Sequence, residues 1–361
     1  MSHPSDDAEG HTLTKGASWV GLAFYALIAF EFFYMAGPFA AYFYAVYGPG
    51  LGMLADNPTA SELLAFFLPH IAAQTTSPLV DAHTAVGGVL FLAGLIGFGV
   101  GAIQIYVNKL RRGADVQRGI YRWIRHPQYL ALIVSSFGML LVWPRFLILF
   151  GFVTLVFIYV ALARAEERQC LRQFPGYAAY RQATGMFLPR VLEAPIRWLP
   201  KPTSRLGRAA GWLTLYLAAL GLTHVGAHAL QGYAVRSLYS AGDEGSVTIS
   251  VGQMSPGDIS RIVTIATTDP VVSAALESAR AAGDVKLLNY VLPTGVFISE
   301  IPMNLPPGAH TGHSFPRQFD RSRYKIIFTR DFERRRSPGQ QRHSVADTYP
   351  VRPCCRGING R

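Results

Sequence analysis

Long apolar runs, each close to the length of a membrane-crossing helix, fill most of the first two thirds of this sequence. A helix needs about 20 apolar residues to cross the hydrocarbon of a bilayer. Five segments approach that length, and they lie at about residues 17–47, 83–107, 128–142, 146–163 and 209–230. Only 15% of the 361 residues are charged, well below the roughly 25% of an average soluble domain. We therefore expect an integral membrane protein.

The runs differ in how they are connected and packed. Trp143-Pro144-Arg145 is all that separates the third run from the fourth, and so short a link predicts a tight antiparallel helical hairpin. The second run holds six glycines between residues 87 and 101. Small residues at this density favour close packing of one membrane helix against another.

Beyond the fifth run the composition changes. Short β-branched runs at 247–251 and 262–265 and an alanine-rich stretch at 272–282 are typical of a small α+β module. We expect an all-α multi-span membrane protein of about five transmembrane helices, a small C-terminal α+β extramembrane module and a disordered tail. Its parts are an N-terminal tail (1–16), a first span with an acidic loop (17–82), a membrane core (83–208), an additional helix (209–232), the module (233–305) and a basic tail (306–361).

Basic residues predict the orientation of the spans, because loops rich in Lys and Arg stay in the cytoplasm. Such residues crowd the segments 109–125 and 164–208, whereas 48–82 contains none. We therefore expect the N-terminus and both basic segments on the cytoplasmic side of a bacterial plasma membrane, and the C-terminal module outside. This topology accounts for most of the net charge of +11 through contact with anionic lipid, so no nucleic-acid partner is expected.

Two polar clusters flank the hairpin. Arg125 and His126 precede Pro127, which suits the first turn of a helix, and the free N–H groups of that turn favour an anion. Glu166 and Glu167 follow the fourth run. Since the two arms of a hairpin end side by side, we expect this cationic group to face the two carboxylates at the membrane surface. Charges at helix boundaries are also common as lipid anchors, and that interpretation stays open.

Four segments in order strengthen the functional interpretation, namely Gly119–Tyr129 with its Arg-His-Pro-x-Tyr sequence, Glu166-Glu167, Phe174–Tyr180 and Leu188-Pro189-Arg190. Together they resemble the isoprenylcysteine carboxyl methyltransferase family. That family groups with the phospholipid methyltransferases among small integral-membrane enzymes that use S-adenosylmethionine. The resemblance covers roughly residues 86–190.

The resemblance implies a role for each matching residue. It implies a catalytic group of Arg125, Glu166 and Glu167. The cofactor ligands that it implies are His126, Tyr129, Tyr121, Glu166 and Glu167, and the acceptor side would be formed by Arg164, Tyr177 and Tyr180. The partners it implies are membrane lipids and a lipophilic methyl acceptor, and no metal is expected.

The expected reaction is methyl transfer to a membrane-embedded acceptor, either the carboxyl group of a prenylcysteine-like or lipidic acid or the amine of a phospholipid. One alternative is a non-catalytic subunit of a larger membrane complex, with partners bound through the external module. Another is the related class of membrane reductases, since a fold alone does not determine function.

Other polar residues point to weaker hypotheses. His224 and His228 share a helix face, for which hydrogen bonding between helices is favoured over metal binding. Glu31 lies inside the first run, where a charge is costly and is either functional or paired. The three cysteines are too few for a disulfide framework or a four-ligand zinc site.

Overall fold

The structure is a computed structural model. The residues it describes are 26, 29–43, 63–70, 74–110, 119–193, 204–243, 245–281, 286–298, 301 and 322–331. The predicted N-terminal tail and residues 48–62 and 71–73 of the acidic loop lie outside the described residues. The chain divides into two compact units, a helical one with 1–67 and 83–229 and a second one with 68–82 and 230–361. Each is described by itself.

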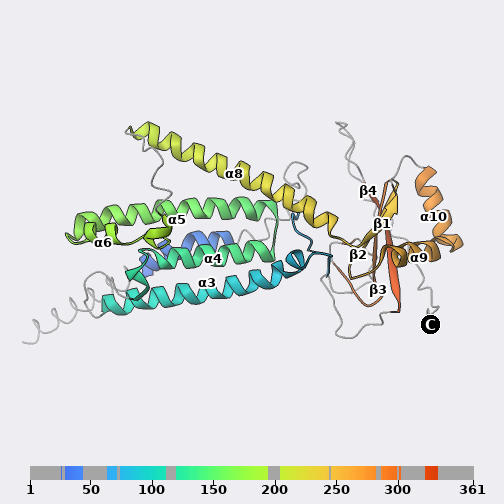
Figure 1. The fold of residues 1–361 in the computed structure, drawn as a ribbon, viewed down its shortest axis with the longest axis horizontal. Coiled ribbons are helices and arrows are strands. Elements are labelled where there is room, and N and C mark those ends of the chain that lie inside the picture. Colours follow the sequence, from blue (N-terminus) through green and yellow to red (C-terminus); the bar gives the residue numbers. More distant parts are fainter. Residues whose placement is uncertain are drawn as a thin grey trace, which may run out of the picture. The chain divides into compact units, whose positions relative to one another are not determined.

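Helices make up the first unit (Figure 1). Residues 29–43 are helical, and the four longer helices are α3 (Pro78–Leu110), α4 (Pro127–Val142), α5 (Phe146–Gln173) and α8 (Arg205–Arg236). Among the described residues, three helices are long and apolar enough to cross a membrane, at 78–108, 146–173 and 206–236, or four if α9 and α10 of the second unit counted as one broken span. Each of the five predicted runs thus contains a helix, the first one within its described residues, while the number of spans stays a prediction.

The predicted hairpin is present. Pro127 begins α4, and α5 starts directly after the link Trp143-Pro144-Arg145. The two arms pack along their length, for example where the rings of Phe137 and Phe152 lie 5.6 Å apart. Helix α5 continues beyond the apolar run to Gln173, so it carries Glu166 and Glu167 on the same rigid element as the membrane segment.

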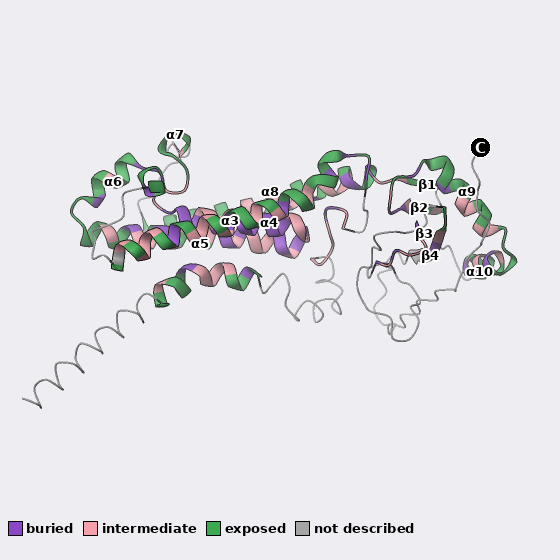
Figure 2. Cartoon of the chain, turned by 90° about the horizontal axis from the view of Figure 1, so that it is seen from below, coloured by how far each residue is buried: buried purple, intermediate pink, exposed green. Residues whose placement is uncertain are grey.

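Glycines bring α3 against α4. A Cβ on Gly94 would lie 2.5 Å from the Ala131 carbonyl oxygen, and one on Gly87 would lie 2.7 Å from that of Gly138. A Cβ on Gly88 would meet nothing within 4 Å. The glycines facing α4 are therefore needed for this close approach, which confirms the predicted packing role. Helix α4 is in consequence largely buried, whereas α8 is mostly exposed (Figure 2).

The second unit contains a four-stranded sheet, which confirms a small sheet region in the C-terminal part. Its strands are β1 (Ser240–Asp243), β2 (Ser246–Ser250), β3 (Lys286–Pro293) and β4 (Tyr324–Asp331), in that spatial order. The β2–β3 pair is parallel and the outer pairs are antiparallel. A parallel pair needs a crossover connection, and α9 (Pro256–Thr267) and α10 (Pro270–Ala281) supply it.

Two sequence interpretations of this unit are wrong. The β-branched run 262–265 is helical, within α9, because Ser255 caps the helix by accepting from the Asp258 N–H while Pro256 occupies its first turn. Ile259, Ile262 and Val263 can then pack on the sheet. The prediction of a disordered tail is wrong for residues 324–331, which form β4 and bury Ile326 and Ile327; apart from 322–331, the predicted tail lies outside the described residues.

Candidate active site

The segment before α4 is held in place by Tyr121. Residues Gly119–Arg122 form a short 3-10 turn, η2, in which Gly119 has φ +63°, a left-handed conformation that glycine adopts readily. The buried Tyr121 hydroxyl donates to the Gly101 carbonyl at 3.2 Å and to Gln128 Oε1 at 2.9 Å. These bonds join the turn to α3 and α4, and so fix the path of the chain into His126.

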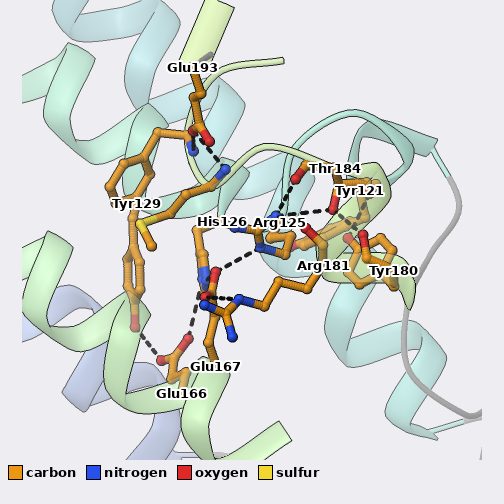
Figure 3. Close-up of polar contacts among 12 residues, drawn as sticks. Tyr121, Arg125, His126, Tyr129, Glu166, Glu167, Tyr180, Arg181, Thr184 and Glu193 are labelled. Atoms are coloured by element: carbon orange, nitrogen blue, oxygen red, sulfur yellow. Dashed lines mark hydrogen bonds and ion pairs between the residues drawn. The ribbon is translucent and has the colours of Figure 1, made fainter. Parts of the chain in front are cut away.

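Glu167 is the centre of a buried charge cluster (Figure 3). Arg125 Nε donates to Glu167 Oε1 at 2.7 Å, and His126 Nε2 lies 3.5 Å from the same oxygen. Arg181 Nε approaches Glu167 Oε2 at 3.2 Å. The Glu167 side chain is only 4% exposed and that of Arg125 7%, so this is an ion pair largely removed from solvent.

Glu166 differs from its neighbour in exposure and in partners. Its side chain is 37% exposed. The Tyr129 hydroxyl donates to its Oε1, and His126 Nδ1 lies 3.4 Å from its Oε2. The His126 ring stacks on Tyr129, with 5.6 Å between ring centroids. The predicted meeting of imidazole and twin acids is therefore observed, with one acid enclosed and the other accessible.

A loop after α6 (Tyr177–Ala183) forms a further wall of the site. The Arg125 N–H donates to the Gly185 carbonyl at 2.9 Å, and the His126 N–H donates to that of Met186 at 3.1 Å. Arg125 Nη1 also donates to the Thr184 carbonyl. Because these bonds reach backbone atoms, the loop 184–188 fixes both cationic residues without supplying a charge of its own.

Glu193 closes this loop from the other side. It ends the short helix α7 (Arg190–Glu193), and its Oε1 accepts from the backbone N–H groups of Met186, Phe187 and Leu188 at 2.7, 2.9 and 3.2 Å. Within the loop, a Cβ on Gly185 would collide with the Leu188 carbonyl. The sequence analysis missed both Gly185 and Glu193. The spacing of Gly185, Pro189 and Glu193 after the tyrosines is a signal for a turn that is closed by a carboxylate.

The acids change the titration of the groups around them. Burial disfavours the charged imidazole of His126, but the carboxylates of Glu166 and Glu167, 3.4 and 3.5 Å from its ring nitrogens, outweigh burial and raise its pKa above the ordinary value. For the Tyr177 hydroxyl, burial and the Glu167 charge both raise the pKa. The two acids therefore favour the protonated form of His126 and the neutral form of Tyr177 relative to the free side chains.

The three residues predicted for the acceptor side, Arg164, Tyr177 and Tyr180, do not all lie together. Tyr180 donates to the Tyr121 carbonyl at 2.6 Å, and the rings of Tyr177 and Tyr180 lie 5.7 Å apart. Arg164 instead places its guanidinium 4.1 Å from the ring centroid of Trp212, on α8. The tyrosines thus belong to the same network as the cluster, whereas Arg164 contacts another helix.

The comparisons with known proteins agree with this geometry. Residues 86–176 match the family model of phospholipid methyltransferases, and this stretch contains His126, Tyr129, Glu166 and Glu167. No curated protein and no solved structure matches the chain. The match at residues 86–176 is consistent with the group of membrane methyltransferases that the motifs resemble.

Proposed function

We propose that this protein is an integral-membrane methyltransferase that uses S-adenosylmethionine to methylate a lipophilic acceptor within the bilayer. The single observation that carries the proposal is the accessible carboxylate of Glu166 beside the buried cluster of Arg125, His126 and Glu167. The basic residues near this end of the hairpin favour the cytoplasmic side of a bacterial plasma membrane.

The side chains present fit this cofactor. S-adenosylmethionine carries an ammonium and a sulfonium, which suit a carboxylate, and its own carboxylate suits an arginine. Glu166 would accept hydrogen bonds from the ammonium or the ribose hydroxyls, with Tyr129 and His126 holding it in place. Arg181, which is 49% exposed, would meet the cofactor's carboxylate. A few charge-assisted hydrogen bonds of about 1.5–3 kcal/mol each suffice for micromolar binding.

The bound cofactor supplies an activated methyl group, so the acceptor's lone pair forms the new bond to carbon as the carbon–sulfur bond breaks. The residues of this chain then have to align the acceptor and exclude water. Tyr129, His126 and Phe187 enclose one side, with the Phe187 ring 6.2 Å from that of His126. A carboxylate acceptor needs no base, whereas an ammonium would first give its proton to a carboxylate such as Glu166.

Labelled cofactor tests the proposal. We expect the full-length protein in nanodiscs to bind S-adenosylmethionine and to transfer labelled methyl groups to a bacterial lipid extract, with the product identified by mass spectrometry. Glu166→Gln should weaken binding at least tenfold, while Glu277→Gln, which removes an exposed acid on α10, should not. A folded wild-type protein that binds no cofactor would favour the non-catalytic subunit instead.

A further inference from the structure

Tyr129, which binds the accessible acid Glu166, is itself held by a second tyrosine. The ring of Tyr159, on α5, stacks on that of Tyr129 with 4.9 Å between their centroids and 26° between their planes. Both tyrosines are fully buried, at 0% exposed. Figure 3 shows the Tyr129 hydroxyl directed at Glu166. The position of this hydroxyl therefore depends on the ring that packs against Tyr129.

The carboxylate of Glu166 depends in turn on that hydroxyl. The Tyr129 hydroxyl donates to Glu166 Oε1, whereas His126 Nδ1 lies 3.4 Å from Oε2, beyond the usual N–H···O distance of about 2.7–3.2 Å. The Glu166 side chain is also 37% exposed, so packing restrains it little. A tilt of the Tyr129 ring would therefore remove the contact that fixes the direction of this carboxylate.

The hydroxyl of Tyr159 connects this arrangement to helix 29–43, which lies outside the family match. It donates to the Met35 carbonyl at 3.2 Å. Nearer the other end of the helix, the Tyr42 hydroxyl donates to the Ser136 carbonyl of α4 at 3.1 Å. Met35 and Tyr42 are buried. The helix is thus bound to both arms of the hairpin, α4 and α5, through a buried interface.

This pairing makes the helix necessary for the stack. A buried hydroxyl needs a hydrogen-bond acceptor, because an unpaired one in apolar surroundings costs free energy. For Tyr159 the acceptor is the Met35 carbonyl, which the matched stretch 86–176 does not supply. Helix 29–43 therefore fixes the ring that fixes Tyr129.

We propose that Tyr159 is a positioning residue for methyl transfer, and that helix 29–43 belongs to the active site because it holds the Tyr159 hydroxyl. The inference rests on the proposed function. Tyr159 keeps the Tyr129 ring in the orientation in which its hydroxyl meets Glu166, so that the carboxylate is in place before the cofactor arrives. A site that is ordered in advance binds its ligand more tightly. Since Tyr159 is fully buried, it acts through Tyr129.

Cofactor binding by full-length variants in nanodiscs tests the inference. Tyr159→Leu removes both the ring and the hydroxyl, and we expect it to raise the Kd of S-adenosylmethionine about tenfold. Tyr159→Phe keeps the stack and loses only the bond to Met35, so it should raise the Kd about threefold. Tyr216→Phe is the matched control. It removes another hydroxyl contact between helices, the one with Thr154 of α5 at 2.9 Å, and should leave the Kd unchanged.

A double-mutant cycle separates positioning from general destabilisation. In a Tyr129→Phe background there is no hydroxyl to orient, so Tyr159→Leu should change the Kd by less than about twofold. Full additivity of the two changes would overturn the inference, and so would equal effects of Tyr159→Leu and Tyr216→Phe in folded variants. A wild-type protein that binds no cofactor would instead overturn the proposed function.

A second measurement requires neither the cofactor nor the leucine variant. A fluorinated tyrosine at position 129 reports the surroundings of that ring by fluorine NMR. We expect Tyr159→Phe to shift or broaden its resonance, because the ring that stacks on it loses its bond to the Met35 carbonyl. Tyr216→Phe should leave the resonance where it is. A resonance that responds equally to both changes, or to neither, would refute the inference.

Discussion

Glu167→Gln keeps the size of the side chain and removes the charge at the centre of the cluster. Both partners of its shortest ion pair are buried, since the side chains of Arg125 and Glu167 are 7% and 4% exposed. Breaking a buried pair costs about 3–5 kcal/mol, because it leaves an uncompensated buried charge. The contact with Arg181, which is 49% exposed, adds at most about 1 kcal/mol. We expect a loss of about 3 kcal/mol, because the amide oxygen still accepts one hydrogen bond.

Glu166→Gln is the matched control. Its side chain is 37% exposed, and the Tyr129 hydroxyl can donate to an amide oxygen as well as to a carboxylate. We therefore expect a stability loss below about 1 kcal/mol together with weaker cofactor binding. Glu167→Gln should in contrast lower the unfolding temperature by roughly 6–12 °C, at about 2–4 °C for each kcal/mol.

Thermal unfolding of the purified variants in detergent, followed by intrinsic fluorescence, measures the stability difference. A double-mutant cycle then isolates the pair, because Arg125→Gln combined with Glu167→Gln should cost clearly less than the two single changes added together. Equal destabilisation by Glu166→Gln and Glu167→Gln would refute the reasoning, and so would full additivity in the cycle.

Three further predictions follow from packing and charge. Gly138→Ala should destabilise the protein by about 1–3 kcal/mol through overpacking against the Gly87 carbonyl, which would lie 2.5 Å from the new Cβ. Gly88→Ala, with open space around it, should change the unfolding temperature little, and equal effects would contradict the packing. Gly185→Ala should abolish cofactor binding without loss of helical circular dichroism, because its Cβ would collide with the Leu188 carbonyl and displace the loop; a variant with normal affinity would show that the loop position is unimportant. The pKa of His126 is raised in the folded protein. The contribution of His126 to the free energy of unfolding should therefore be complete below the ordinary pKa of about 6.5, and it should disappear as the pH rises through the higher pKa of the folded protein. His126→Asn should remove that part of the pH dependence, and an unchanged stability profile would argue against a protonated imidazole.

The hairpin and the meeting of its charges could be predicted from sequence because their signals are local. Pro127 marks the first turn of α4, and the link 143–145 leaves no room for anything but an antiparallel return. Residues at the open end of such a hairpin must be neighbours, so His126 and Glu167 could be paired before any coordinates. The same holds for Gly87 and Gly94, since small residues at helical spacing mark a close helix contact.

The position of the loop 184–188 could not be predicted in the same way, because backbone atoms of the loop make its contacts with Arg125 and His126. The carbonyls of Thr184, Gly185 and Met186 hold Arg125 and His126, and side-chain identity says little about where a carbonyl points. Glu193 is informative only once the three N–H groups converge on it. The strand β4 was missed for another reason, since the composition averaged over residues 306–361 conceals a short run of β-branched and aromatic residues within 324–331.

Glu166 and Glu167 are adjacent residues of the same type, but their positions on α5 give them different exposure and different partners. Successive residues on a helix point about 100° apart, so when Glu167 faces the buried Arg125, Glu166 has to lie at the flank, next to Tyr129. The buried acid fixes the position of the cationic residues, and that leaves the accessible one to meet a ligand. The helix at 29–43 packs on Tyr159, whose ring stacks on Tyr129, so the tyrosine that holds the accessible acid is itself held from a segment outside the family match.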